Sequence, residues 1–267
     1  MGRIEKRFKL LQKEGEKALI PFITAGDPDF EVTKSLLIEI ERSGGDLIEI
    51  GVPFSDPLAD GPIIQKSYQR ALNKGVSLRK IIALIEGLRE KIHIPIILMI
   101  AYNLLYQYGE TEFVKDAVSA GIDGIIVPDL PPEEARSLMD LAQGVGLDII
   151  FLLAPTSTQD RIKDICQKSQ GFIYYISLTG VTGVRDKLSD DIRDKIAEIK
   201  RISEKPVVIG FGVSNPEQTA MTGELADGVV VGSAIVKIIE ENIDRGDLTT
   251  IVGSFVKELK KGMQRRQ

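Results

Sequence analysis

Eight short apolar runs, rich in Ile and Val, recur along the 267-residue chain and constrain its fold more than any other feature. The runs are ALIPFITAG (18–26), LIEIGV (47–52), IPIILMIAY (94–102), GIIVPD (124–129), DIIFLLAP (148–155), FIYYISLT (172–179), PVVIGFGV (206–213) and GVVVGSAIV (228–236). They are too continuous for strands with one face in water, which alternate apolar and polar residues. Runs that are apolar on both faces are typical of parallel strands covered by helices. We therefore expect a buried parallel sheet.

Amphipathic segments separate these runs. They cover residues 33–43, 62–91, 111–120, 133–143, 159–168, 190–203 and 216–222, and a last one, 247–265, closes the chain. In front of the first run, Ile4, Phe8 and Leu11 fall at helical spacing. About eight strand–helix units with an additional N-terminal helix predict a (β/α)8 TIM barrel, and a doubly wound open sheet is the alternative. No Pro/Gly/Ser-rich linker divides the chain, so we expect a single barrel domain over residues 1–267.

Charge and cysteine content narrow the function classes. The formal net charge of −5 argues against a nucleic-acid surface, because phosphate binding along a duplex needs a basic patch. No apolar run is long enough to span a membrane, and the charged N-terminal segment does not resemble a secretory signal. The single cysteine, Cys166, is expected on a helix face and is consistent with a reducing compartment. We expect a cytoplasmic protein that binds neither nucleic acid nor membrane.

Glu49 is the one charged residue in the run LIEIGV. Strand alternation places it on the same face as Leu47 and Gly51, and one face of each strand lines the barrel interior. None of the eight runs contains Lys or Arg to pair with it. A buried carboxylate without a cation is costly unless it is protonated, and burial should raise its pKa towards neutrality. A carboxyl group in that state can act as both acid and base, although a purely structural Glu satisfied by hydroxyl or backbone groups remains the alternative.

The loop after this strand, PFSDPLADG, carries two further carboxylates, Asp56 and Asp60. Pro53 and Pro57 restrict its backbone and predict an ordered loop. The Asp-Gly pair at 60–61 precedes Pro62 and indicates a turn into a helix, so Asp60 is a candidate for either helix capping or catalysis. For Asp56 we expect a turn or an interface role.

Glycines follow the last three strands, where barrels commonly hold phosphate. They occur in GVTG (180–183), GFG (210–212) and GS (232–233). Glycine lets the backbone approach a ligand closely, and N–H groups of a loop or helix N-terminus bind anions. These loops therefore predict a phosphate site.

Other chemistries find no support in the sequence. The strand ends carry no Lys for a Schiff base, and His93, the only histidine, precedes the third strand at the bottom of the predicted barrel. A transition-metal site and a nicotinamide site are equally unsupported, because there is no His cluster and no GxGxxG after the first strand. What remains is acid–base chemistry by carboxylates on a phosphorylated substrate.

Five segments together resemble the tryptophan synthase alpha subunit family over nearly the whole chain. They are PFITAGDP (21–28), IEIGVPFSDPLADGPIIQ (48–65), VPDLP (127–131), SLTGVTG (177–183) and GFGVS (210–214). The resemblance implies a lyase of tryptophan biosynthesis that cleaves indole-3-glycerol phosphate to indole and glyceraldehyde 3-phosphate. It implies no cofactor in this chain and a beta subunit partner that carries pyridoxal phosphate, in an alpha2-beta2 heterotetramer.

The resemblance also assigns residues. Glu49 and Asp60 match the catalytic carboxylates of the family, and the loop of Pro53, Phe54, Asp56 and Pro57 is implied as the partner contact, with Val52 and Leu58 adding apolar surface. The substrate-binding residues implied by the family motifs are Phe22, Ile100 and Tyr102 around the indole, Tyr174 near the two carboxylates, Gly183, Gly212, Gly232 and Ser233 at the phosphate, and Thr182. Position 178 is Leu where some members of the family carry Arg. Another phosphate-binding barrel enzyme and a non-catalytic allosteric subunit stay open as alternatives.

Overall fold

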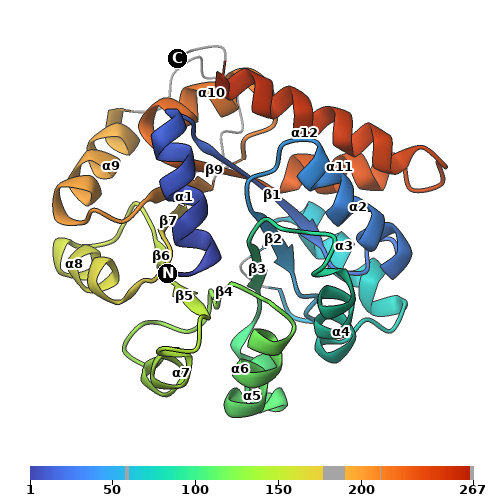
Figure 1. Ribbon diagram of the computed structural model, residues 1–267, viewed down its shortest axis with the longest axis horizontal. Coiled ribbons are helices and arrows are strands. Elements are labelled where there is room, and N and C mark those ends of the chain that lie inside the picture. The colour runs from blue at the N-terminus through green and yellow to red at the C-terminus, as the bar shows by residue number, and fades with distance from the viewer. Residues whose placement is uncertain (58–59, 177–189, 211, 265–267) are drawn as a thin grey trace.

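The computed structural model describes residues 1–57, 60–176, 190–210 and 212–264. The strands are β1 (Ala18–Thr24), β2 (Ile48–Gly51), β3 (Ile96–Met99), β4 (Gly124–Ile126), β5 (Asp148–Ile150), β6 (Leu152–Leu153), β7 (Ile173–Ile176), β8 (Val207–Gly210) and β9 (Gly228–Val231). All pairings between them are parallel, in the order β5-β4-β3-β2-β1-β9-β8-β7-β6. Since β5 and β6 are pieces of one run interrupted at Phe151, the two ends of this order meet. The sheet is therefore a nearly closed barrel (Figure 1).

Helices surround the strands (Figure 1). They are α1 (Arg3–Glu14), α2 (Phe30–Arg42), α3 (Pro62–Asn73), α4 (Leu78–Leu88), α5 (Tyr102–Tyr108), α6 (Glu110–Ser119), α7 (Arg136–Ala142), α8 (Gln159–Lys168), α9 (Asp190–Ile202), α10 (Pro216–Leu225), α11 (Ser233–Glu241) and α12 (Leu248–Gln264). The predicted TIM barrel with an additional N-terminal helix is confirmed.

Two element boundaries differ from the prediction. The segment 62–91 forms two helices, α3 and α4, because Gly75 adopts a left-handed φ of 69° that ends the first one. The run 228–236 is not one strand: β9 ends at Val231, and α11 begins at Ser233 directly after Gly232. Because β9 ends at Val231, the N-terminus of α11 lies at the C-terminal end of the barrel, where the functional sites of this fold are found.

The apolar core consists of two clusters. The outer cluster lies between strands and helices, and the inner cluster fills the barrel and includes Phe22, Tyr68 and Tyr174. Helix α1 contributes Ile4, Phe8 and Leu11 to the inner cluster, and the ring of Phe8 lies 5.7 Å from that of Phe172. The additional helix therefore closes the N-terminal end of the barrel and leaves the opposite end for ligands.

Asp46, just before β2, connects α1 and α12 to that closed end. It is fully buried and accepts hydrogen bonds from the backbone N–H of Leu19 at 2.7 Å and from Lys260 Nζ on α12 at 2.9 Å. Arg7 of α1 donates to its other oxygen. A buried charge with this many donors is compensated, so Asp46 fixes both terminal helices against the barrel.

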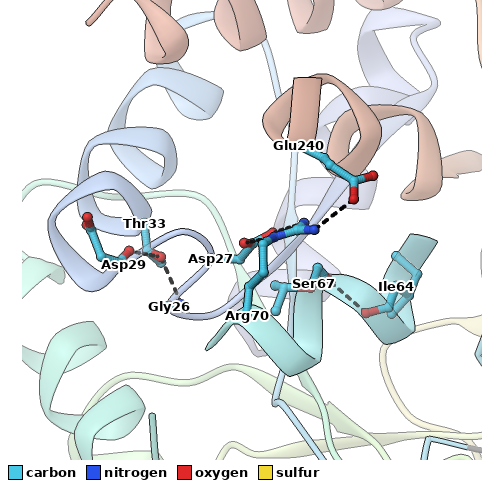
Figure 2. A network of polar contacts seen from close by, with 9 residues as sticks. Gly26, Asp27, Asp29, Thr33, Ile64, Ser67, Arg70 and Glu240 are labelled. Atoms are coloured by element: carbon cyan, nitrogen blue, oxygen red, sulfur yellow. Dashed lines mark hydrogen bonds and ion pairs between the residues drawn. The ribbon is translucent and has the colours of Figure 1, made fainter. Parts of the chain in front are cut away.

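A second buried carboxylate, Asp27, connects the loop after β1 to two helices that border the open end (Figure 2). Arg70 of α3 donates to both oxygens of Asp27, at 2.8 and 2.9 Å, and to Glu240 of α11 at 3.0 Å. Burial raises the pKa of Asp27, and the bonds from Arg70 act in the opposite direction. Bidentate Arg–carboxylate pairs are strong and geometrically specific, so Arg70 fixes α3 and α11 relative to β1.

We predict that Arg70→Met lowers the free energy of unfolding by about 2–3 kcal/mol, because Asp27 would remain buried without its cation. Urea denaturation of the purified chain measures the change. The matched control is Arg245→Met, which breaks an exposed pair with Asp247 and should change the free energy of unfolding far less. Equal effects of the two substitutions would contradict the anchoring role of Arg70.

Candidate active site

Glu49 lies inside the barrel, as its alternation with Ile48 and Ile50 predicts. In the strand register it stands beside Phe22 of β1 and Ile97 of β3, both members of the inner cluster. Its side chain is 1% exposed, and the carboxylate atom Oε2 has no hydrogen-bond partner among the described residues. A buried, incompletely satisfied carboxyl group is costly in its ionised form.

The pKa of Glu49 is raised from 4.5 to about 8, chiefly by burial and then by the charge of Asp60, while a hydrogen bond with Tyr174 acts in the opposite direction. A rise of this size means that ionising Glu49 in the folded protein costs about 5 kcal/mol more than in water. The pKa of about 8 already includes the hydrogen bond with Tyr174, so that bond does not keep Glu49 ionised at neutral pH. Near neutral pH, Glu49 is therefore mostly protonated and holds a proton available for transfer.

Tyr174 projects from β7 into the same space and is 4% exposed. Its hydroxyl oxygen lies 2.5 Å from the position that a Cβ atom on Gly210 of β8 would occupy. Only glycine at position 210 leaves room for this hydroxyl beside Glu49. Burial and the charge of Glu49 raise the pKa of Tyr174 well above 10, so its hydroxyl stays a donor.

Asp60 precedes α3 and is half-buried at the C-terminal end of the barrel, where the charges of Asp60 and Glu49 interact. Burial raises its pKa. The backbone of its loop is held in place: Asp60 N–H donates to Pro57 O at 3.1 Å, and Gln65 Nε2 donates to Asp60 O at 2.8 Å. The capping alternative finds no support, because Gly61 is the N-cap of α3 and no side chain caps the helix.

Gly232 and Ser233 form the N-terminus of α11 on the neighbouring side of the open end. No side chain caps this helix, so its first N–H groups are available to an anion. A Cβ on Gly232 would lie 3.4 Å from Phe22, which places this terminus beside the wall of the inner cluster. Gly212 has a φ of 30° and open space around it. Thr182 and Gly183, and Leu178 with them, lie outside the described residues.

Of the predicted indole-pocket residues, the structure brings Phe22 together with Glu49 but orients two others differently. Ile100 is buried in the outer cluster, because Ile97 and Met99 take the inward positions of β3. Tyr102 is only partly buried at the start of α5, and its hydroxyl donates to Glu110 at 3.0 Å. The assignment of both residues to the indole pocket stays a prediction.

The loop after β2 is more buried than predicted at its start. Val52 and Pro53 are buried, so the expectation that Val52 adds exposed apolar surface was wrong. Val52 is buried because the pairing of β2 with β3 continues one residue further, with Val52 N–H donating to Met99 O at 2.8 Å. Phe54 is partly exposed, and Asp56 is exposed with its carboxylate accepting from the Ser55 hydroxyl. Pro57 is partly buried, and Leu58 lies outside the described residues.

The sequence analysis missed Tyr68, which lies on the inward face of α3 and is 4% exposed. Its pKa is raised well above 10 by burial and by the charges of Asp60 and Glu49. The available signal was the spacing of Ile64, Tyr68 and Ala71, which marks one buried face of a helix that starts directly after Asp60.

Remaining predictions concern residues away from this site. His93 is exposed at the N-terminal end of the barrel, and Cys166 is buried on α8, both as predicted. Among the described residues there is no group of three or more His, Cys, Asp or Glu side chains arranged to hold a metal ion. The described helices include none that is both long and apolar enough to cross a membrane.

Comparisons with known proteins agree with this geometry. The family described as "Tryptophan synthase alpha chain" matches residues 8–264. The tryptophan synthase alpha chain of Geotalea uraniireducens is 51% identical over 265 residues, which cover 99% of this chain and 98% of the relative. The tryptophan synthase alpha chain of Citrifermentans bemidjiense is 49% identical over 98% of each chain. The crystal structure of tryptophan synthase subunit alpha from Legionella pneumophila superposes with a TM-score of 0.92 at 36% identity, covering 99% of each chain. The chain belongs to the tryptophan synthase alpha chain family.

Proposed function

We propose that Glu49 and Asp60 carry out the lyase reaction of this family, the cleavage of indole-3-glycerol phosphate into indole and glyceraldehyde 3-phosphate, within a single barrel domain spanning residues 1–267. The reaction is the indole-releasing step of tryptophan biosynthesis. The observation that carries the proposal is a buried Glu49 with an unpartnered carboxylate oxygen inside the barrel, whose pKa is raised by burial and by the charge of Asp60.

The bond that breaks joins indole C3 to the first carbon of the glycerol phosphate side chain. C3 gains a proton, and the hydroxyl on that side-chain carbon loses its proton as the carbon becomes the aldehyde of glyceraldehyde 3-phosphate. Atoms and electrons balance without an oxidant or reductant. The protein therefore has to supply an acid, a base and an acceptor for the ring N–H.

Glu49 suits the proton transfers because burial brings its pKa to about 8, close to a working pH. It delivers its proton to C3 and takes up the proton of the side-chain hydroxyl. Asp60 accepts a hydrogen bond from the indole N–H and stabilises the positive charge that develops on the ring. Tyr174 orients Glu49, and Phe22 forms the apolar wall beside it.

The phosphate of the substrate would bind at the N-terminus of α11, with Gly232 and Ser233, and near Gly212. Support comes from the uncapped helix N-terminus and from its position beside Phe22. Thr182 and Gly183 are proposed for the same site from their family motif. Ile100 and Tyr102 are proposed for the indole pocket from their family motif.

A beta subunit carrying pyridoxal phosphate is the proposed partner, in an alpha2-beta2 assembly; this chain itself is proposed to need no cofactor. The proposed contact is the loop of Pro53, Phe54, Asp56 and Pro57, of which Phe54 and Asp56 reach the surface. This loop leads directly to Asp60, so a partner that binds it would influence the position of a catalytic carboxylate.

We predict that Glu49→Gln lowers the rate of indole-3-glycerol phosphate cleavage at least about 100-fold, because the amide keeps the shape of the side chain but transfers no proton. Indole release by the purified chain is measured with and without a beta subunit. The control is Asp148→Asn, since the pKa of Asp148 is also raised, to about 6, but that residue lies at the opposite end of the barrel. Turnover of the Glu49 variant near that of the control would exclude the acid–base role.

The phosphate site gives a second prediction. Gly232→Asp should weaken the binding of glycerol phosphate at least about tenfold more than Gly232→Asn, because the two side chains have nearly the same size and only Asp repels the anion. A Cβ at this position makes ordinary contact with Phe22, so both variants should fold. Titration calorimetry measures the affinities. Equal affinities of the Asp and Asn variants would place the phosphate elsewhere.

A further inference from the structure

Helix α3, which follows Asp60, begins without the usual side-chain cap. Its N-cap is Gly61 and its first residue is Pro62, and neither has a side chain that can hydrogen-bond to the preceding loop. Gln65, the fourth residue of the helix, reaches back instead: its Nε2 donates to Asp60 O at 2.8 Å and to Pro57 O at 3.3 Å. Both partners are carbonyl oxygens, so the amide nitrogen of Gln65 is the atom that has to face them.

These bonds close a turn between Pro57 and Asp60. The N–H of Asp60 also donates to Pro57 O, at 3.1 Å, so that carbonyl accepts from the backbone and from Gln65 together. Among the described residues, no other side chain hydrogen-bonds to the backbone of Pro57 or Asp60. The two amide protons of one side chain therefore hold both ends of the turn against the helix.

Helix α3 is itself fixed to the barrel, so Gln65 projects from a rigid support. The fully buried Ser67 donates its one hydroxyl proton to Ile64 O at 2.7 Å, so its 2.6 Å contact with the buried hydroxyl of Thr24 is a bond that Thr24 donates. Three residues further on, Arg70 binds both oxygens of Asp27 (Figure 2). These contacts tie α3 to the end of β1 and to the loop that follows it.

We propose that Gln65 is a positioning residue of the reaction, which holds the backbone of Asp60 so that its carboxylate meets the N–H group of the indole. This inference rests on the proposed function, in which Asp60 accepts that hydrogen bond and stabilises the positive charge of the ring. Gln65 is exposed, and its two carbonyl partners can bond to water in its absence. Folding therefore does not require Gln65, whereas the position of Asp60 does.

Gln65→Met is the decisive variant, because Met has nearly the same length and donates no hydrogen bond. Misplacing a reacting group by about 1 Å can cost about 100-fold in rate, and we expect kcat for indole release to fall about tenfold. KM should change less than about threefold, because the positive charge on the ring develops only in the transition state. The control is Gln69→Met, which removes an exposed bond to Asn73 one turn further along α3. A kcat equal to that of the control would overturn the proposal.

Titration of Glu49 in the purified chain without substrate tests the positioning independently of turnover. The charge of Asp60 raises the pKa of Glu49, so an Asp60 that is released by Gln65→Met and turns towards water should lower the midpoint of the Glu49 carboxyl 13C signal. We expect a decrease of about half a unit, since a close charge typically shifts a pKa by about 1–3 units. Tyr68 and Tyr174 do not titrate in this range, because their pKa values lie well above 10.

The two measurements separate this inference from the proposed function. An unchanged Glu49 midpoint in Gln65→Met would refute the positioning role. A lowered midpoint in a chain that shows no cleavage of indole-3-glycerol phosphate would refute only the proposed function.

Discussion

The removal of Glu49 from water is the physical constraint on which the rest of the site depends. A carboxyl group on the inward face of a parallel barrel is surrounded by apolar side chains, and Phe22 and Ile97 stand beside it in the register. The resulting rise in pKa to about 8 turns an ordinary Glu into a group that can give and take a proton near neutral pH. Among the described residues, no cation lowers the pKa of Glu49, and none of the described strands contains Lys or Arg.

The fold holds Asp60 and the proposed phosphate site near the carboxyl group of Glu49. Helix α1 fills the N-terminal end of the barrel, so a ligand can approach Glu49 only from the C-terminal end. There, Arg70 ties α3, which follows Asp60, to α11, whose N-terminus is the proposed phosphate site (Figure 2). Gln65 holds the backbone of Asp60 from within α3 itself. The distance between the carboxylates and the proposed phosphate site therefore depends on a few polar contacts.

Much of this could be predicted from the sequence, and the failures have physical causes. Apolar runs indicate parallel strands, and Glu49 stands out because a carboxylate is unusual in such a run. Strand parity turns Ile97 and Met99 inward and places Ile100 in the outer cluster, which motif resemblance alone does not indicate. Tyr68 was missed because the inward face of α3 becomes part of the site only when the barrel places that helix beside Gly51.

The pKa of Glu49 itself is the most direct test of this account. With 13C-labelled glutamate, the carboxyl signal that disappears in Glu49→Gln can be titrated in the folded chain without substrate. Because burial favours the neutral form, the account predicts a midpoint near 8, with the group protonated below and ionised above that pH. A midpoint near the ordinary value of about 4.5 would show that Glu49 is solvated or paired, and would contradict its role as a proton donor at neutral pH.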